Sequence, residues 1–395
     1  MRTLCRSWGF ASALLFSFST IAFSAEAEWS RAYVLERQEH AFYFPGDGAA
    51  EDPGPDCPSG ANPALDRRAA LKTTYRSWAE VDAILDPEKP SFGRNGGFRG
   101  PNRENVYDEP WAVPDPASMR EVESKISYGF DLDGDASTGF TGIDGTPGVD
   151  NNYYKMAGCM LAYRGKPRTT GQFGYEYMLN GFFTVLLVVS GDGDEPMNDA
   201  NVKVAYYLSA DDILKDANGD VTPHLTYRVD PDPRFQSVFD AKTENGVLTA
   251  THPQTLVLHD QVQASFFPQI LTLHQGQVKF DMHEDGSLSG VIGGYQSTEH
   301  FFLGWSDAGG IHESVSRVDI PAYWYALRRN ADYQIDPGAP FNDAISAAYR
   351  QYFLPAYVTF PDGKAQLTEA KLVEGEIDEK WSRRPARKRN PEWRY

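Results

Sequence analysis

Residues 130–152 contain the densest group of side chains that could bind a metal ion. This stretch reads FDLDGDASTGFTGIDGTPGVDNN and holds five Asp and five Gly without a single Lys or Arg. Carboxylates crowded in this way repel one another unless a cation lies among them. Calcium fits best because it accepts about six to eight oxygens in a flexible geometry. The sequence therefore predicts a calcium site with the candidate ligands Asp131, Asp133, Asp135, Asp144, Asp150 and Asn151.

The spacing of Asp131, Asp133 and Asp135 matches the start of an EF-hand loop, but the match then fails. The sixth position, which should be Gly, is Ala136, and the twelfth, which should be a bidentate Glu, is Gly142. What the spacing predicts is a non-helical calcium loop, in which glycines let backbone carbonyls approach the ion. The alternative is a solvated turn, because Asp and Gly are common turn formers.

Two further acidic segments follow. Residues 190–201, SGDGDEPMNDAN, form a second acidic loop, and its candidate ligands are Asp192, Asp194 and Asp199. Asp216, Asn218 and Asp220 repeat the alternation more weakly, and there the composition favours a plain turn.

The blocks FDLDGD, GVDNN and SGDGDEPMND carry a resemblance over roughly residues 97–295. They resemble a loosely defined set of uncharacterised exported bacterial proteins, in which a strand runs into an Asp-rich loop that ends in Asp-Asn before the next strand. The resemblance implies an exported β protein and implies no activity.

Known catalytic motifs are missing from the sequence. It has no Gly-x-Ser-x-Gly, His-Glu-x-x-His, Walker, dinucleotide-binding or Cys-x-x-Cys pattern. The best histidine cluster is His300 and His312, with Glu299, Asp307 and Glu313 nearby. His312-Glu313 begins a His-Glu-x-x-His zinc motif, but the second His of that motif is missing. Surface or hydrogen-bonded histidines are the favoured interpretation, so no catalytic centre is assigned.

The N-terminus predicts export. Arg2 and Arg6 precede an apolar run over residues 8–23, and small residues follow, which is typical of a signal peptide spanning residues 1–24. The run is shorter than a membrane-spanning helix, so an integral membrane protein is not expected. The predicted location is the periplasm or the extracellular space.

Export also bears on the cysteines. Cys57 and Cys159 remain after the leader, and in an oxidising compartment they predict one disulfide. The alternative is a pair of separate buried thiols.

The net charge limits the classes of partner. The formal charge of −18 disfavours nucleic acid and anionic lipid, and it suits divalent cations, a glycan or another envelope protein. The last sixteen residues run against this trend, with seven Lys and Arg against one Glu, and they predict a charged, partly disordered tail.

Composition and spacing predict a mainly β fold. Gly 35, Pro 26 and 13% aromatic residues are typical of a loop-rich β protein. The apolar run 181–189 predicts a strand buried on both faces. The sequence lacks the blade repeat that would indicate a propeller. The spacing favours an antiparallel β-sandwich, jelly-roll-like, with a few peripheral helices at both ends. The predicted strands are 125–130, 153–164, 181–189, 202–208, 225–229, 246–251, 256–258, 270–273, 278–282 and 287–292.

The predicted organisation has five parts. Predicted helices are 78–85, one through residues 319–328, and 343–353. The parts are a signal peptide (1–24), a loop-rich N-terminal wrap (25–120), the sandwich body with the acidic loops (121–318), a helical extension (319–360) and the tail (361–395).

The functional hypothesis is an exported, calcium-stabilised protein with a binding or structural role in the envelope. The rival is a secreted hydrolase of polysaccharides or esters, with a cleft formed by residues 88–117 and the region from His300 to His312. A carbohydrate-binding module is a third alternative.

Overall fold

Eight antiparallel strands form a closed β-barrel. The computed structural model describes residues 28–45, 51–62, 104–113, 119–164, 178–260, 269–307 and 316–361, together with residues 77, 79, 115 and 176. Each barrel strand pairs with the next in the order β1, β4, β5, β7, β8, β10, β11, β12. They are β1 (Trp29–His40), β4 (Val185–Gly191), β5 (Asp199–Leu208), β7 (Ser237–Glu244), β8 (Val247–Ala250), β10 (Gln269–Met282), β11 (Leu288–Ser297) and β12 (Ala344–Thr359).

The prediction of a β-sandwich is wrong, because the sheet closes on itself. β1 pairs with β4 on one side and with β12 on the other, with Ala32 opposite Ala356 and His40 opposite Tyr349. A sandwich would leave edge strands, whereas this pairing gives every barrel strand two neighbours. The pairing of β1 was not predicted. β1 lies within residues 25–120, which were expected to wrap a body that begins only at residue 121.

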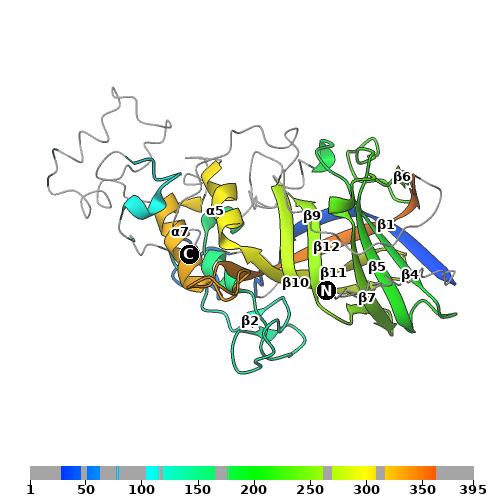
Figure 1. Ribbon diagram of the computed structural model, residues 1–395, viewed down its shortest axis with the longest axis horizontal. Coiled ribbons are helices and arrows are strands. Elements are labelled where there is room, and N and C mark those ends of the chain that lie inside the picture. The colour runs from blue at the N-terminus through cyan, green and yellow to red at the C-terminus, as the bar shows by residue number, and fades with distance from the viewer. Residues whose placement is uncertain are drawn as a thin grey trace, which may run out of the picture.

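Four short strands lie outside the barrel path. β9 (Gln254–Asp260) pairs with β10, and β6 (Thr226–Arg228) runs parallel to the end of β12. β2 (Ile126–Ser127) and β3 (Thr141–Gly142) form a small parallel pair. That pair belongs to the acidic loop and projects from the body beside the barrel (Figure 1).

The helices gather at one side of the barrel. In the part of the chain that the structure describes, the α-helices are α3 (Asn152–Ala157), α5 (Thr298–Asp307) and α7 (Ile320–Asn330). Short 3-10 helices span Pro110–Ala112, Leu161–Tyr163 and Pro233–Phe235. α5 and α7 lie together on the left of Figure 1, with the barrel on the right. As predicted, Asp319 starts a helix: its side chain accepts a hydrogen bond from the Ala322 N–H.

Two of the predicted elements have the wrong type. Residues 153–164 were predicted as a strand, but Asn151 caps a helix there by accepting a hydrogen bond from the Tyr154 N–H. Residues 343–353 were predicted as a helix, but they belong to β12, whose pairing with β1 and β11 outweighs the helical preference of its alanines. The predicted helix 78–85 lies almost wholly outside the described residues, as do the signal peptide and the tail beyond residue 361.

Side chains fill the barrel interior. Tyr206 of β5 and Phe280 of β10 both contact Phe353 of β12, with ring centroids 6.3 and 5.8 Å away. Neither β5 nor β10 is a neighbour of β12 in the sheet, so these contacts cross the interior. A polar chain crosses it as well: the Tyr206 hydroxyl donates to Gln351, whose amide donates to Gln38. An eight-stranded barrel is just wide enough for such filling.

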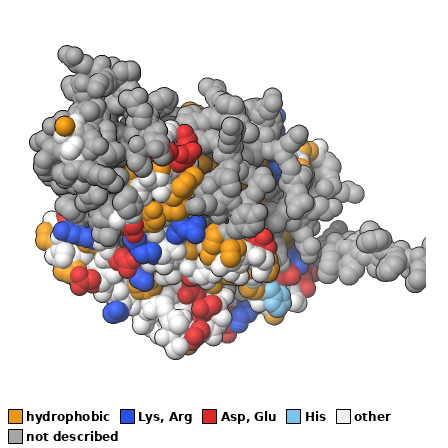
Figure 2. All heavy atoms as spheres, turned by 60° about the vertical axis from the view of Figure 1, so that its left-hand side comes forward, with side chains coloured by type: hydrophobic (Ala, Val, Ile, Leu, Met, Phe, Trp, Pro, Cys, Tyr) orange, Lys and Arg blue, Asp and Glu red, His pale blue; other side chains and the backbone are white. Residues whose placement is uncertain are grey.

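The described part of one face mixes both signs of charge (Figure 2). Figure 2 shows acidic and basic side chains interspersed, with hydrophobic side chains between them, on the face that carries the helices. The net charge of −18 is therefore not spread as a uniform acidic layer over that part of the face. None of the helices in the described ranges is long and apolar enough to cross a lipid bilayer.

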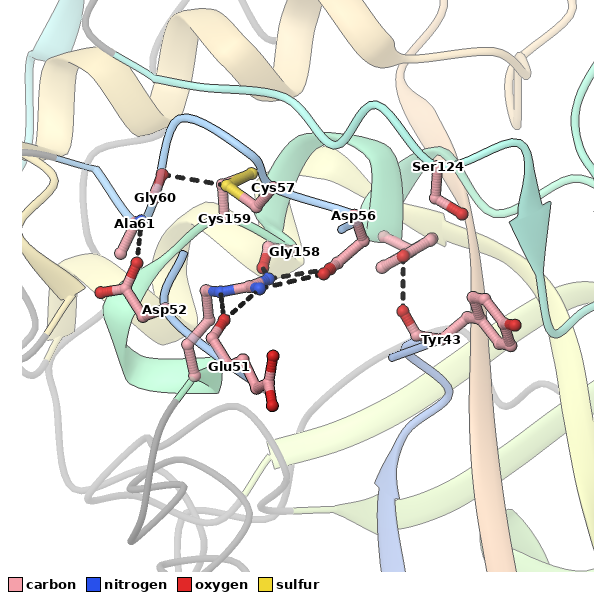
Figure 3. Close-up of polar contacts among 12 residues, drawn as sticks. Tyr43, Glu51, Asp52, Asp56, Cys57, Gly60, Ala61, Ser124, Gly158 and Cys159 are labelled. Carbon is pink, nitrogen blue, oxygen red and sulfur yellow. Dashed lines mark hydrogen bonds and ion pairs between the residues drawn. A yellow bond between two sulfur atoms is a disulfide. The ribbon is translucent and has the colours of Figure 1, made fainter. Parts of the chain in front are cut away.

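A disulfide and a buried ion pair fasten residues 51–62 to the segment after α3. The predicted disulfide Cys57–Cys159 is confirmed, and it joins residues 102 positions apart. Next to it, the Arg164 guanidinium donates to both carboxylate oxygens of Asp56 and to the carbonyls of Glu51 and Gly158 (Figure 3). Both side chains of the ion pair are almost fully buried. Loops of this length gain about 2–5 kcal/mol from a disulfide.

We expect Asp56→Ala to lower the free energy of unfolding by about 3–5 kcal/mol, because it leaves the buried Arg164 charge without a counter-ion. Urea unfolding followed by fluorescence measures the change. The matched control is Glu244→Ala, which breaks the exposed pair with Lys242 and should cost about 1 kcal/mol or less. Equal losses in the two variants would contradict the role assigned to the buried pair.

Candidate metal centre

The acidic loop is folded back on itself. Phe130 bridges to Asp150 and Phe140 to Val149, so the two ends of the loop lie side by side. Gly139 has φ 68°, and a Cβ there would lie 2.5 Å from the Val149 carbonyl oxygen. Glycine is therefore required where the two passes of the chain approach each other.

The loop docks on the outside of the barrel wall. The Arg350 guanidinium of β12 lies over the ring of Tyr128, 5.1 Å from its centroid. Phe130 packs so closely on Gly293 of β11 that a Cβ at that glycine would lie 2.8 Å from the ring. Lys279 of β10 contacts Asp144 at 2.8 Å. Three neighbouring strands therefore fix the position of the loop.

Three of the predicted ligands come together. Asp131, Asp133 and Asp150 each offer one oxygen, and these oxygens all lie within 4.8 Å of one another. Asp150 is buried, Asp131 is half-buried and Asp133 is exposed. At that separation two full charges repel by about 3 kcal/mol at an effective dielectric constant of about 20. The three carboxylates could therefore hold a metal ion.

Hydrogen bonds from described residues reach one oxygen of each carboxylate. Asp131 Oδ1 accepts from the Gly134 N–H, and Asp133 Oδ1 accepts from the Asp135 N–H. Asp150 Oδ2 accepts from the N–H groups of Leu132 and Asp133. The second oxygen of each carboxylate accepts no hydrogen bond from the residues that the structure describes.

Burial raises the pKa of Asp150 to about 6, and the negative charges of Asp133 and Asp131 add to this rise. Hydrogen bonds from the backbone of Leu132 and Asp133 act in the opposite direction. The charged form of Asp150 is thus disfavoured at the place where its oxygen faces two other carboxylates. A proton or a cation relieves the same repulsion.

The other three predicted ligands have different partners. Asp135 accepts hydrogen bonds from Ser137, and the Lys279 ammonium holds the pKa of Asp144 well below its usual range. Asn151 is fully buried; it caps α3, and its amide group donates to the Ala41 and Tyr128 carbonyls and to the Ser127 hydroxyl. An Asn oxygen serves equally as a helix cap or a metal ligand, so sequence reasoning could not separate the two roles.

The second acidic loop does not gather its carboxylates in the same way. Asp199 accepts hydrogen bonds from the Trp29 indole and from the Gly193 and Asn201 N–H groups, which fix the start of β5. Asp192 contacts Asn201 at 3.4 Å. Among the described residues, the only group of three or more potential metal-binding side chains that converges is Asp131, Asp133 and Asp150. The second acidic site remains a prediction.

The structure adds Asp332, which sequence reasoning missed. It follows α7 and accepts hydrogen bonds from both the N–H and the hydroxyl of Ser346 on β12. Burial raises its pKa to about 7, opposed by these hydrogen bonds and assisted by the charge of Asp150. No local pattern marks this residue, because its proximity to the acidic loop arises only through β12.

Residues 150–152 join the candidate site to the rest of the fold. Asp150 holds the loop, Asn151 caps α3, and the Asn152 N–H donates to the Ser346 hydroxyl. The Asn152 side chain donates to the Asn330 carbonyl at the end of α7. Asp150 is therefore next in sequence to the residues that join the loop to two helices and β12.

The structure describes only part of the predicted histidine cluster. Burial lowers the pKa of His300, on α5, to about 4, and its Nε2 finds no hydrogen-bond partner in the described ranges. His312 and Glu313 lie outside the described residues, as does most of the segment 88–117.

Comparison with known proteins does not extend these observations. No family model, no curated protein and no solved structure matches the chain. The function proposed for this protein therefore rests on the geometry of the site.

We expect Asp150→Asn to stabilise the cation-free protein at pH 7.5 by about 1–3 kcal/mol. A carboxyl whose folded pKa is raised contributes stability below its unfolded pKa and loses it as pH rises through about 6, so the benefit of Asn should vanish near pH 4. Thermal melts in chelator across this range test the prediction.

The matched control is Asp144→Asn in the same loop. The pKa of Asp144 is lowered, so this variant should lose a little stability at pH 7.5 rather than gain it. A destabilised Asp150→Asn protein at pH 7.5 in chelator would contradict the electrostatic account.

Proposed function

We propose that this is an exported protein whose acidic loop binds a calcium ion, and that it serves a binding or structural role in the cell envelope. The observation that carries the proposal is the convergence of Asp131, Asp133 and Asp150, each with one oxygen free of hydrogen bonds from the described residues. All three ligands are oxygens, the kind that hard cations prefer.

Calcium is favoured over magnesium by the form of the site. Magnesium requires a nearly ideal octahedron and keeps several waters, whereas calcium tolerates irregular sets of carboxylates and carbonyls. The ligands here come from both ends of a glycine-rich loop, and they range from exposed to buried. Such an irregular set is better suited to the larger ion.

The proposed role of the ion is stabilisation. A cation there relieves the repulsion that Asp133 and Asp131 exert on Asp150, next to the residues that cap α3 and contact β12. A ligand that binds only the folded state stabilises it by about 2.7 kcal/mol at 100 times its dissociation constant.

Export is supported by two features. The apolar run over residues 8–23 follows two arginines, and Cys57 and Cys159 form a disulfide, a bond that persists in oxidising compartments. The proposed location is the periplasm or the extracellular space, and a glycan or another envelope protein is the proposed partner.

The rival candidate, a secreted hydrolase of polysaccharides or esters, has one observation in its favour. The pKa of Asp332 is raised to about 7 by burial, which suits a general acid, and the charge of the nearby Asp150 adds to the rise. Both Asp332 oxygens, however, accept hydrogen bonds from Ser346, which gives the residue a structural role. We therefore favour binding over catalysis.

We expect excess calcium to raise the melting temperature at pH 7.5 by several degrees relative to chelator, because the ion binds the folded form preferentially. Asp133→Asn should reduce most of this rise, since it removes one of the three negative charges that attract the ion, without disturbing a buried contact. Differential scanning calorimetry measures both.

Asp194→Asn, in the other acidic loop, is the matched control and should retain the full response. If wild-type protein gives the same melting curve in calcium and in chelator, the calcium proposal fails. If magnesium stabilises the protein more than calcium does, the identity of the ion is wrong.

A further inference from the structure

His40, the last residue of β1, lies where the barrel meets the helices. It is paired with Tyr349 of β12, and the centroids of the two rings are 4.8 Å apart. The ring of Tyr153 on α3 lies 4.8 Å from the imidazole, and that of Phe301 on α5 lies 6.3 Å from it. Tyr153 and Phe301 also stack on each other, with centroids 4.0 Å apart. His40 therefore contacts the barrel wall and two helices at once.

The imidazole ring of His40 is enclosed but forms no hydrogen bond. Phe42 and Tyr163 complete its aromatic surroundings, with centroids 5.4 and 5.3 Å away. Only 7% of the residue is exposed, and within the described ranges neither ring nitrogen has a hydrogen-bond partner. A polar group buried without a partner loses its hydrogen bonds to water, which costs free energy even in the neutral form. The charged form would lose far more.

Among the described residues, no charged group offsets a positive charge on this ring. The titratable side chains that face it are Tyr349 from β12, Tyr153 from α3 and Tyr163 from the 3-10 helix, and tyrosine hydroxyls are uncharged in acid. α5 contributes Phe301, and the chain after β1 contributes Phe42. Burial alone lowers the pKa of His40 to about 3.

Acid favours a state in which this ring meets water. The faces of aromatic rings attract a cation, but without water or a counter-ion this attraction is smaller than the loss of hydration. When the helices separate from the barrel, the pKa of His40 returns to about 6.5. A base with a lowered folded pKa contributes stability above its unfolded pKa and loses it as pH falls. Between pH 6.5 and about 3, each pH unit therefore favours the separated state about tenfold.

The helices are joined to one another around the same ring. The Tyr153 hydroxyl is hydrogen-bonded to the hydroxyls of Tyr163 and of Tyr323 on α7, at 2.9 and 3.3 Å. His300, next to Phe301 on α5, is a second buried histidine; its Nε2 has no partner among the described residues, and burial lowers its pKa to about 4. Acid therefore acts in the same direction on both sides of the junction.

We propose that His40 makes this junction sensitive to acid: its protonation loosens the packing of α3 and α5 on the barrel before the barrel itself unfolds. The barrel strands are held by backbone N–H and C=O groups, which do not titrate in this range, whereas the junction has a titratable group at its centre. The inference goes beyond the proposed function and does not depend on it, because it requires no bound cation.

The test is hydrogen–deuterium exchange of the full chain in chelator at pH 6.5 and pH 4.5, with rates corrected for the intrinsic effect of pH. Residues 152–157 and 298–307 report on α3 and α5, and β4 and β5 report on the barrel. Between these pH values the protection of the two helices should fall about 100-fold more in wild type than in His40→Phe, which keeps a ring that cannot be protonated. β4 and β5 should remain more protected than the helices at both pH values.

Comparison between variants removes the contribution of other groups. Asp150 also titrates in this range, but it does so in wild type and in the variants alike. His40→Gln is a second neutral variant, smaller than Phe, and it should lose the acid response as well. His283→Gln changes an exposed histidine between β10 and β11; it is the matched control and should respond as wild type does.

Several outcomes would contradict the inference. It fails if α3 and α5 keep their protection at pH 4.5 in wild type, or if His40→Phe and His40→Gln lose it to the same extent. If the helices and the barrel strands exchange at the same rate at pH 4.5, the transition is global and the local release is rejected. If neither variant folds, NMR titration of wild type decides. A His40 resonance that titrates near pH 6.5 while the helices stay protected overturns the inference, and one that is unchanged down to pH 4.5 supports it.

Discussion

The backbone hydrogen bonds between β1 and β12 are the interaction on which the rest of this structure depends. They join the first strand of the described chain to the last one in the barrel, with Val34 opposite Leu354 and Gln38 opposite Gln351. Without them the sheet would have two long open edges. The same strand β12 also presents Ser346 to Asp332 and Asn152. Closure of the barrel therefore also fixes the surroundings of the carboxylates of Asp131, Asp133 and Asp150.

A closed and filled barrel places the candidate site outside the wall. The interior is occupied by aromatic side chains and by the chain of hydrogen bonds through Gln351, which leaves the outer surface and the loops for ligands. The acidic loop uses that outer surface through Phe130 on Gly293 and Asp144 on Lys279. These contacts fix the position of a glycine-rich segment, and that segment carries Asp131, Asp133 and Asp150.

The correct predictions from sequence concern features that depend on residues close together in the chain. The apolar run near residue 185 became β4, whose seven residues are all buried, and the density of Asp marked the loop where three carboxylates meet. Asn151 was predicted to be a metal ligand. Its role as a cap depends on the helix α3, and residues 153–164 had instead been predicted as a strand. Asp332 carried no mark at all, since only its hydrogen bonds from Ser346 of β12 bring it near the acidic loop. The barrel was missed for the same reason, because closure is a property of two strands about 300 residues apart.

No salt bridge among the described residues reaches Asp131, Asp133 or Asp150. Lys279 is already paired with Asp144, and the charges that act on Asp150 from within the loop are those of Asp133 and Asp131, both negative. A proton relieves only part of this repulsion, because it neutralises one carboxylate and leaves two facing each other. A divalent cation bound as proposed would contact one oxygen of each of the three carboxylates. Under the proposed function a proton and a cation would compete for the same carboxylates, and ionisation of Asp150 above its pKa of about 6 would favour the cation.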